Sequence, residues 1–198
     1  MKIVYISRSI IPSRTANSIN VMKMCNTFAS LGHEVTLLAP WTKKLEQKGV
    51  IDIFDYYGVD KNFELKKLYA PSIKYLKKRI YSFRTLNEVK KINPDLVYGR
   101  DDMFAFYLAQ KNGYRTIFEK HEPYDGKGFN DYFFKKFMNK ESAKMIVNSK
   151  ELKKMYHESC DINFDSILAA NNGTNVIPDE EVPSTVKLDI NKIQIGYV

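Results

Sequence analysis

His121 is the residue whose type and position best suit chemistry, because it lies at the carboxyl end of a short predicted strand. Two carboxylates, Glu119 and Glu122, flank it within two residues. A histidine at the end of a buried strand can hydrogen-bond a substrate that lies in a cleft. The same pattern is also typical of a loop histidine bonded only to a neighbouring carboxylate. His33 lies in a tight helix-to-strand turn and His157 near a helix end, so we assign neither of them such a role.

A second polar group, Arg100-Asp101-Asp102, follows another apolar run. The guanidinium group can bind a phosphate or carboxylate of an acceptor. Adjacent aspartates could hold a metal, but they more often cap the next helix, where negative charge is favourable. The two cysteines and three histidines match no zinc spacing. Ser7 and Ser149 have no evident histidine and acid partners, so we expect no metal site or serine nucleophile and interpret Ser149 as a helix cap.

The elements that must position these residues begin with a strand, a helix and a strand in the first forty residues. Apolar, β-branched runs at 2–7 and 33–40 flank a segment whose apolar residues recur at the spacing of one helix face. We expect Asn17 or Ser18 to cap this helix and Gly32 to end it in the left-handed conformation. Two parallel strands joined by a helical crossover open a doubly wound α/β sheet.

The alternation of strand and helix continues to residue 170, which bounds the first predicted domain, 1–170. Further strands are predicted at residues 63–68, 95–98, 116–119, 145–147 and 167–170. Helices are predicted at residues 51–57, 73–89, 103–110, 129–139 and 150–157. The fold class is therefore α/β, a Rossmann-like doubly wound, mostly parallel sheet with helices on both faces. Residues 171–192 are interpreted as a loop and linker, and 193–198 as the first strand of a second domain that we expect to continue beyond this chain.

The loop after the first strand is the first place to look for a ligand, because ligands of doubly wound sheets lie at the carboxyl ends of the strands. Residues 8–20 contain no glycine, and no Gly-Lys-Ser/Thr occurs anywhere. This composition argues against a dinucleotide site or a P-loop. No apolar run approaches the ~20 residues of a membrane-spanning helix, and Cys25 is expected in the core, so we predict a reducing, cytoplasmic location.

The formal net charge of +8 lies entirely in residues 61–91, which hold ten basic and two acidic residues. Four basic residues fall off the predicted apolar stripe of the helix there: Lys74, Lys77, Lys78 and Arg84. A solvated helix surface is the default interpretation. Such a segment can also lie on an anionic membrane, or bind single-stranded nucleic acid through interleaved basic and aromatic residues. We favour the membrane and expect a peripheral position on its inner face, with nucleic acid as the alternative.

Several short motifs, in their order and spacing, resemble the N-terminal domain of a family 4 glycosyltransferase with the GT-B architecture. They are Leu31-Gly32-His33-Glu34-Val35, Tyr57-Gly58-Val59, Val97-Tyr98-Gly99-Arg100, Phe118-Glu119-Lys120-His121, Ile146-Val147-Asn148-Ser149, Asn172-Gly173 and Ile195-Gly196-Tyr197-Val198. Family members often have a glycine pair in the first loop, where this chain has Ala16-Asn17-Ser18. The small residues still permit close approach of a ligand.

The resemblance implies that the parent enzyme transfers a sugar, with retention, from a nucleotide-sugar donor to a glycan or lipid-linked acceptor. It implies no cofactor and no required metal. His121 is expected to hydrogen-bond the transferred sugar as the catalytic residue. The expected substrate-binding residues are Asn17, Ser18, Arg100, Glu119, Glu122, Asn172 and Gly173. Because the family's second domain binds the nucleotide sugar and carries paired glutamates, the resemblance implies that this chain alone is inactive.

A non-catalytic interpretation stays open beside the enzyme. A basic α/β module could dock on nucleic acid or an anionic membrane and carry out no chemistry. A second domain with a Glu-x7-Glu pattern following this chain would favour the transferase over this module.

Overall fold

The computed structural model describes residues 1–41, 46–70, 77–100, 102–124, 126, 128–138 and 140–171. Its seven-stranded sheet has the order β3-β2-β1-β4-β5-β6-β7, and every neighbouring pair is parallel. The strands are β1 (Lys2–Ile6), β2 (Glu34–Trp41), β3 (Glu64–Tyr69), β4 (Leu96–Arg100), β5 (Thr116–Lys120), β6 (Ala143–Val147) and β7 (Ile167–Ala169). The predicted α/β fold class is confirmed.

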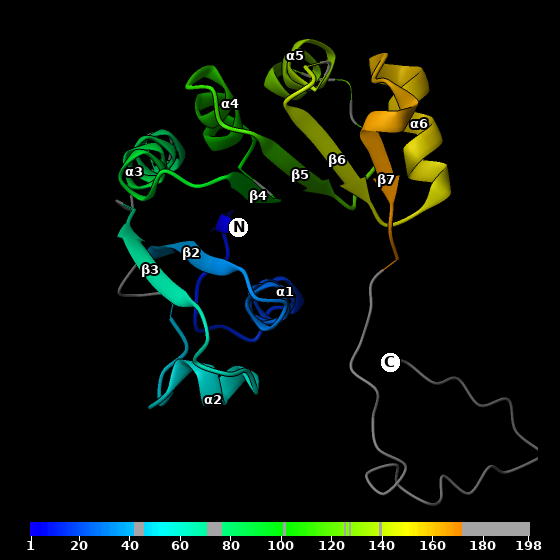
Figure 1. Cartoon of the computed structure of the whole chain (residues 1–198). Helices are drawn as coiled ribbons and strands as arrows, with labels where there is room; N and C mark the ends of the chain where they lie inside the picture. Colours follow the sequence, from blue (N-terminus) through cyan, green and yellow to red (C-terminus); the bar gives the residue numbers. More distant parts are fainter. Residues whose placement is uncertain are drawn as a thin grey trace, which may run out of the picture.

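Helices cover both faces of the sheet (Figure 1). One face carries α1 (Ala16–Ser30) and α2 (Ile53–Tyr57). The opposite face carries α3 (Lys77–Ile92), α4 (Met103–Lys111), α5 (Gly128–Phe137) and α6 (Lys150–Cys160). A short 3-10 helix, Phe164–Ser166, leads into β7.

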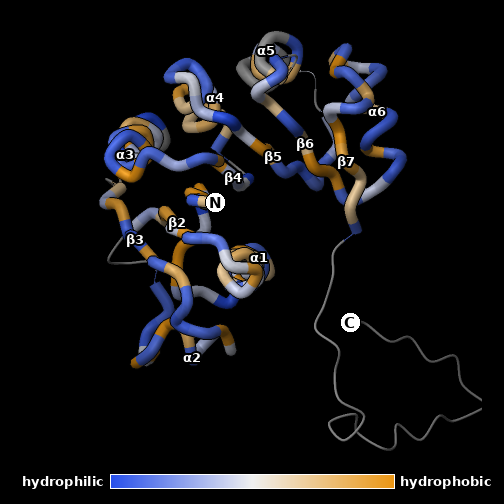
Figure 2. The backbone as a smooth tube through the Cα atoms, in the orientation of Figure 1, coloured by the Kyte–Doolittle hydropathy of each residue, from blue (hydrophilic) through white to orange (hydrophobic). Residues whose placement is uncertain are grey.

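The sheet separates two apolar cores. Between the sheet and α3–α6, rings such as Phe106, Phe118 and Phe133 are buried. Between the sheet and α1–α2, Tyr5 and Tyr98 pack beside the buried faces of both helices. Figure 2 shows hydrophobic residues both on strands and on parts of the helices that cover them.

The chain reverses its direction of winding between β1 and β4. These strands are neighbours in the sheet, yet the chain leaves β1 toward α1 on one face and β4 toward α4 on the other. Gly99 permits their close approach, because its φ is +142° and a Cβ there would lie 2.1 Å from the carbonyl oxygen of Ile6. Two loops that diverge in this way leave a crevice at the carboxyl edge, the usual ligand position in such sheets.

The start of α1 differs from the sequence-based prediction. The N-cap is Thr15, whose side chain accepts from the Ser18 N–H, rather than Asn17 or Ser18. The Ser18 hydroxyl is itself used inside the loop, since it donates to the carbonyl oxygens of Ser13 and Thr15. The predicted left-handed Gly32 is confirmed, with φ +83°.

Three other local predictions have clear outcomes. Asp102 caps α4 and Ser149 caps α6, as predicted. Cys25 is buried, as expected, and is a free cysteine. Phe83 of α3 is half exposed and packs on Phe104 of α4. Lys74, Asn172, Gly173, the linker beyond residue 171 and the strand predicted at 193–198 lie outside the described residues.

Candidate active site

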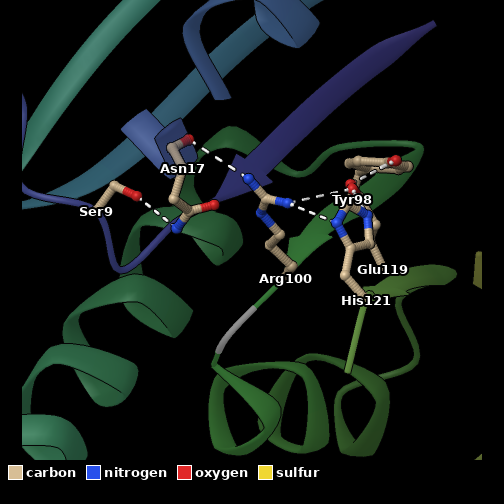
Figure 3. Close-up of polar contacts among 6 residues, drawn as sticks. All are labelled: Ser9, Asn17, Tyr98, Arg100, Glu119 and His121. Carbon is tan, nitrogen blue, oxygen red and sulfur yellow. Dashed lines mark hydrogen bonds and ion pairs between the residues drawn. The ribbon is translucent and has the colours of Figure 1, made fainter. Parts of the chain in front are cut away.

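Four polar side chains meet at the carboxyl ends of β4 and β5 (Figure 3). Arg100 ends β4 and lies in register with Glu119 of β5, while His121 directly follows β5. Tyr98 is two residues before Arg100, so both side chains point to the face of the sheet that α1 covers. Neighbouring parallel strands thus bring together residues that are about 20 positions apart in sequence.

Both ring nitrogens of His121 contact charged side chains. Nδ1 lies 3.2 Å from Nη1 of Arg100, and Nε2 lies 2.6 Å from Oε1 of Glu119. Arg100 Nη1 is also 3.5 Å from the same carboxylate oxygen. The three side chains therefore form one closed polar cluster (Figure 3).

Glu119 is the anionic centre of this cluster and is only 5% exposed. Burial acts to raise the pKa of its carboxyl group, but the hydrogen bond from His121 and the positive charge of Arg100 outweigh burial, so the pKa is lowered. The Tyr98 hydroxyl donates to the second oxygen, Oε2, at 3.0 Å. Burial and the nearby Glu119 charge raise the pKa of Tyr98 well above its usual range, so it stays a neutral donor. The site therefore contains a fully hydrogen-bonded carboxylate beneath His121.

The first turn of α1 closes the other side of the cluster. Arg100 Nη2 donates to the backbone carbonyl oxygen of Asn17 at 3.5 Å. The Asn17 side chain in turn donates to the Ser9 hydroxyl at 2.7 Å, as Figure 3 shows. The β1–α1 loop is thereby tied to β4, although the two segments are more than 80 residues apart in sequence.

A pocket of about 390 Å³ opens over the cluster. Its lining residues are Ala16, Asn17, Asn20, Arg100, Glu119, Lys120, His121 and Glu122. A second pocket of about 670 Å³ shares Asn17, Lys120 and Glu122 with it and extends toward Arg8, Ser13 and Met103. The Tyr156 hydroxyl of α6 donates to the Glu122 carbonyl oxygen at 2.9 Å and fixes the backbone beyond His121. Along the carboxyl edge of the sheet, the two pockets together contain positively and negatively charged side chains that can hydrogen-bond hydroxyl groups.

Most of the predicted site residues lie in this one place. Asn17, Arg100, Glu119, His121 and Glu122 all line the smaller pocket. The sixth described residue, Ser18, is fully buried and lines neither of these two pockets.

The lining residues that were not predicted from the sequence include Asn20, Lys120 and Arg8. Lys120 lies between two predicted site residues, and its amine pairs with Glu122 across the pocket rim. Side chains along a strand alternate between the two faces of the sheet. Lys120 is the last residue of β5, and only there, where the strand ends, can its side chain point toward the carboxyl edge. Its position next to His121 was the available signal.

The candidate membrane patch is placed only in part. Lys77 and Lys78 are the first residues of α3. Arg84 lies on the exposed surface of α3, where its guanidinium group donates to the Tyr69 carbonyl oxygen at 3.1 Å and lies 5.2 Å from the Tyr69 ring centre. Tyr81, Leu86 and Val89 of the same helix are buried, whereas Arg79, Arg84, Lys90 and Lys91 are exposed.

Two kinds of feature are absent from the described part of the chain. No three histidine, cysteine, aspartate or glutamate side chains there are grouped so that they could hold a metal ion. None of the described helices combines the length and apolar character needed to cross a bilayer.

Comparison with known proteins shows the family to which the chain belongs. A model of the family described as Glycosyltransferase Family 4 matches residues 19–176. None of the curated proteins compared with the chain matches it.

Three of the similar solved structures give the extent of the likeness. A glycosyltransferase from Rickettsia africae ESF-5 has a TM-score of 0.62 at 16% identity, over 88% of this chain and 43% of that chain. Sucrose-phosphate synthase from Thermosynechococcus elongatus has a TM-score of 0.65 at 12% identity, over 88% and 48%. UDP-GlcNAc 2-epimerase from Neisseria meningitidis, bound to UDP-GlcNAc, has a TM-score of 0.54 at 8% identity, over 85% and 46%. At these identities the likeness shows the fold alone, and the chain spans about half the length of the structures it matches.

Proposed function

Because the chain belongs to glycosyltransferase family 4, we propose that it forms the acceptor-side half of a retaining glycosyltransferase. The complete enzyme moves a sugar from a nucleotide-sugar donor to a glycan or lipid-linked acceptor. A nucleotide-sugar donor is supported by the fold neighbour bound to UDP-GlcNAc. A second, donor-binding domain is supported by the length of the neighbours, of which this chain covers about half.

The observation that carries the proposal is the polar pocket over His121. It lies between the diverging β1 and β4 loops, where ligands of doubly wound sheets bind. Its lining combines Asn17 and Asn20 with the charged Arg100, Lys120 and Glu122, groups that can hydrogen-bond several hydroxyls of a sugar at once. Transferred sugar and acceptor would both reach His121 from this side.

The carboxylate cluster also suits glycosyl transfer chemically. Positive charge develops on the sugar during glycosidic bond cleavage, as it does in glycoside hydrolysis. Glu119 carries a negative charge and contacts His121. This charge would stabilise the positive charge that develops on the sugar. This contribution is made without a metal or an organic cofactor.

The experiment that tests the proposal uses the complete enzyme with labelled nucleotide sugars and candidate acceptors. Product analysis should find the label linked to an acceptor with the anomeric configuration of the donor. A free 2-epimer of the sugar, or the released nucleotide with no linked product, contradicts the proposal.

A role at the membrane is a separate proposal and rests on charge alone. The excess positive charge of the chain lies in residues 61–91. In α3, Tyr81, Leu86 and Val89 are buried, whereas the basic residues Arg79, Arg84, Lys90 and Lys91 are exposed. The outward basic residues would attract an anionic inner leaflet, where a lipid-linked acceptor is found. The competing proposal of a nucleic-acid-binding module is tested by the same binding measurement, described below.

A further inference from the structure

The two ring nitrogens of His121 contact partners of opposite hydrogen-bonding character. A guanidinium group can only donate, so Nδ1 must accept from Nη1 of Arg100 at 3.2 Å. An ionised carboxylate can only accept, so Nε2 must carry a proton and donate to Oε1 of Glu119 at 2.6 Å. The contacts therefore select one state of the ring, the neutral form with its proton on Nε2.

We propose that Arg100 is a positioning residue that keeps His121 neutral with its single proton on Nε2. The proposal rests on the proposed function only in assuming that His121 serves sugar transfer. A second proton, on Nδ1, would point at a guanidinium N–H and place two positive charges side by side. The guanidinium group keeps its positive charge throughout the physiological pH range, so it opposes a proton on Nδ1 at every pH in that range.

The surroundings of Arg100 fix its guanidinium group beside His121. It is 9% exposed, and its Nη2 donates to the Asn17 carbonyl oxygen of α1. Its Nη1 also faces Glu119 at 3.5 Å. A lysine ammonium could supply one of these contacts but not the forked geometry that reaches all of them.

Neutrality of the ring matters because of the charges that face it. Arg100 of β4 and Glu119 of β5 balance each other, and Lys120 pairs with Glu122 at the rim. Tyr98 and the Asn17 carbonyl add no net charge. A protonated His121 would leave a surplus positive charge where positive charge also develops on the transferred sugar.

His157 supplies an internal reference with the opposite tautomer. Its Nδ1 lies 2.7 Å from the Ile162 carbonyl oxygen, which can only accept, so that proton must be on Nδ1. The two histidines are therefore expected to give opposite patterns of nitrogen protonation in one spectrum.

The test is ¹⁵N NMR of the histidine rings in this chain between about pH 6 and pH 8, the range in which an unperturbed histidine loses its proton. The wild-type chain should show His121 neutral and protonated on Nε2 across the range, with His157 protonated on Nδ1 wherever it is neutral. A positively charged His121 at neutral pH, or a proton on its Nδ1, overturns the proposal without any variant being needed.

Variants then assign the effect to Arg100. In Arg100→Met the carboxylate of Glu119 remains, so His121 should gain a second proton near neutral pH while His157 is unchanged. Arg100→Lys, which keeps one donor and the charge, should keep the ring neutral, and the double variant Arg100→Met/Glu119→Gln should return it to neutrality. An unaltered His121 signal in folded Arg100→Met means that Arg100 does not set the state of the ring.

Activity separates this proposal from the proposed function. In the complete enzyme, Arg100→Met should shift the acid limb of the kcat profile to higher pH by about 1 to 2 units, the size of effect a neighbouring charge exerts. Arg100→Lys should largely reverse the shift. A neutral His121 in an enzyme that transfers no sugar rejects the proposed function alone, whereas active enzyme with a charged His121 rejects the role of Arg100 alone.

Discussion

The hydroxyl of Tyr57 bonds both backbone groups of Ser13, accepting from its N–H at 2.7 Å and donating to its carbonyl oxygen at 2.9 Å. Tyr57 ends α2, whereas Ser13 lies in the β1–α1 loop that borders the larger of the two site pockets. A short helix away from His121 therefore determines the path of a loop at the candidate active site. A phenolic hydroxyl suits this task because it donates and accepts at once.

Tyr57→Phe should lower the free energy of unfolding by about 1 to 3 kcal/mol, because the Ser13 N–H loses its partner and the Ser13 carbonyl oxygen keeps only the Ser18 hydroxyl. Urea unfolding of the chain measures this loss. The neighbouring Tyr56, which is 37% exposed, provides the matched control, and Tyr56→Phe should change stability by less than about 0.5 kcal/mol. Equal stability of the two variants would mean that Tyr57 does not hold the loop.

His121→Ala should lower the turnover of the complete enzyme by about 10²- to 10³-fold, the usual effect of removing a hydrogen bond that strengthens in the transition state. Its stability should fall by less than about 1 kcal/mol, because Arg100 and Glu119 are already 3.5 Å apart and can pair directly. His33→Ala, in the turn before β2, is the control for loss of a partly exposed histidine. A near-wild-type rate, or a loss explained by unfolding, removes His121 from the site.

The fold could be predicted from the sequence, and so could the grouping of three residues at the candidate site, for related physical reasons. Strand and helix periodicities are local, so the alternating elements could be placed from them. Once the strands are parallel, residues at their carboxyl ends must meet at one edge, which is why Arg100, Glu119 and His121 lie together.

Side-chain orientation within loops could not be predicted in the same way. Ser18 was expected to touch substrate, but its hydroxyl bonds the carbonyl oxygens of Ser13 and Thr15. Asn17 lines the pocket, yet it reaches Arg100 through its backbone carbonyl. Both outcomes depend on the geometry of the turn before α1. A turn has no periodic pattern of apolar residues from which side-chain directions could be predicted.

Glu119 should make stability depend on pH in acid. Burial acts to raise the pKa of its carboxyl group, but the bond from His121 and the charge of Arg100 lower it overall. A carboxylate with a lowered pKa in the folded state stabilises the protein above its unfolded pKa of about 4.3. That contribution is lost as pH falls through the lower pKa of the folded state.

Glu119→Gln should therefore be less stable than wild type at pH 7, and the two should converge as pH falls below about 4. Unfolding in urea at a series of pH values measures the difference. Glu141→Gln, at an exposed position before β6, is the control and should show no such convergence. A constant difference between Glu119→Gln and wild type at every pH contradicts a charge-based contribution.

This chain alone should fold cooperatively and yet transfer no sugar. The described residues already form a seven-stranded sheet with an apolar core on each face, so we expect them to fold without a further domain. The donor site, however, is proposed to lie mainly in a second domain. Circular dichroism with thermal unfolding checks the first part, and incubation with a set of nucleotide sugars checks the second. Turnover of any of them by the chain alone would show that it contains a complete donor site.

The basic segment 61–91 should bind anionic membranes, and this binding should weaken as the salt concentration is raised. Each basic residue close to an anionic surface contributes about 1 kcal/mol, and the Debye length falls from about 10 Å at 0.1 M salt to about 3 Å at 1 M. Sedimentation with anionic and with neutral vesicles at these two salt concentrations measures the effect. Binding is expected only to anionic vesicles and mainly at low salt.

Charge-neutralising variants locate the contact on the chain. Lys77→Gln/Lys78→Gln, at the start of α3, should weaken vesicle binding. Lys150→Gln/Lys154→Gln, at exposed positions of α6, removes the same charge elsewhere and should have little effect. Equal losses in both double variants indicate a general charge effect, and equal binding to neutral and anionic vesicles, or none to either, leaves a solvated helix surface. Tighter binding to single-stranded nucleic acid than to vesicles favours the non-catalytic module, because the same positive charge would then serve a different polyanion.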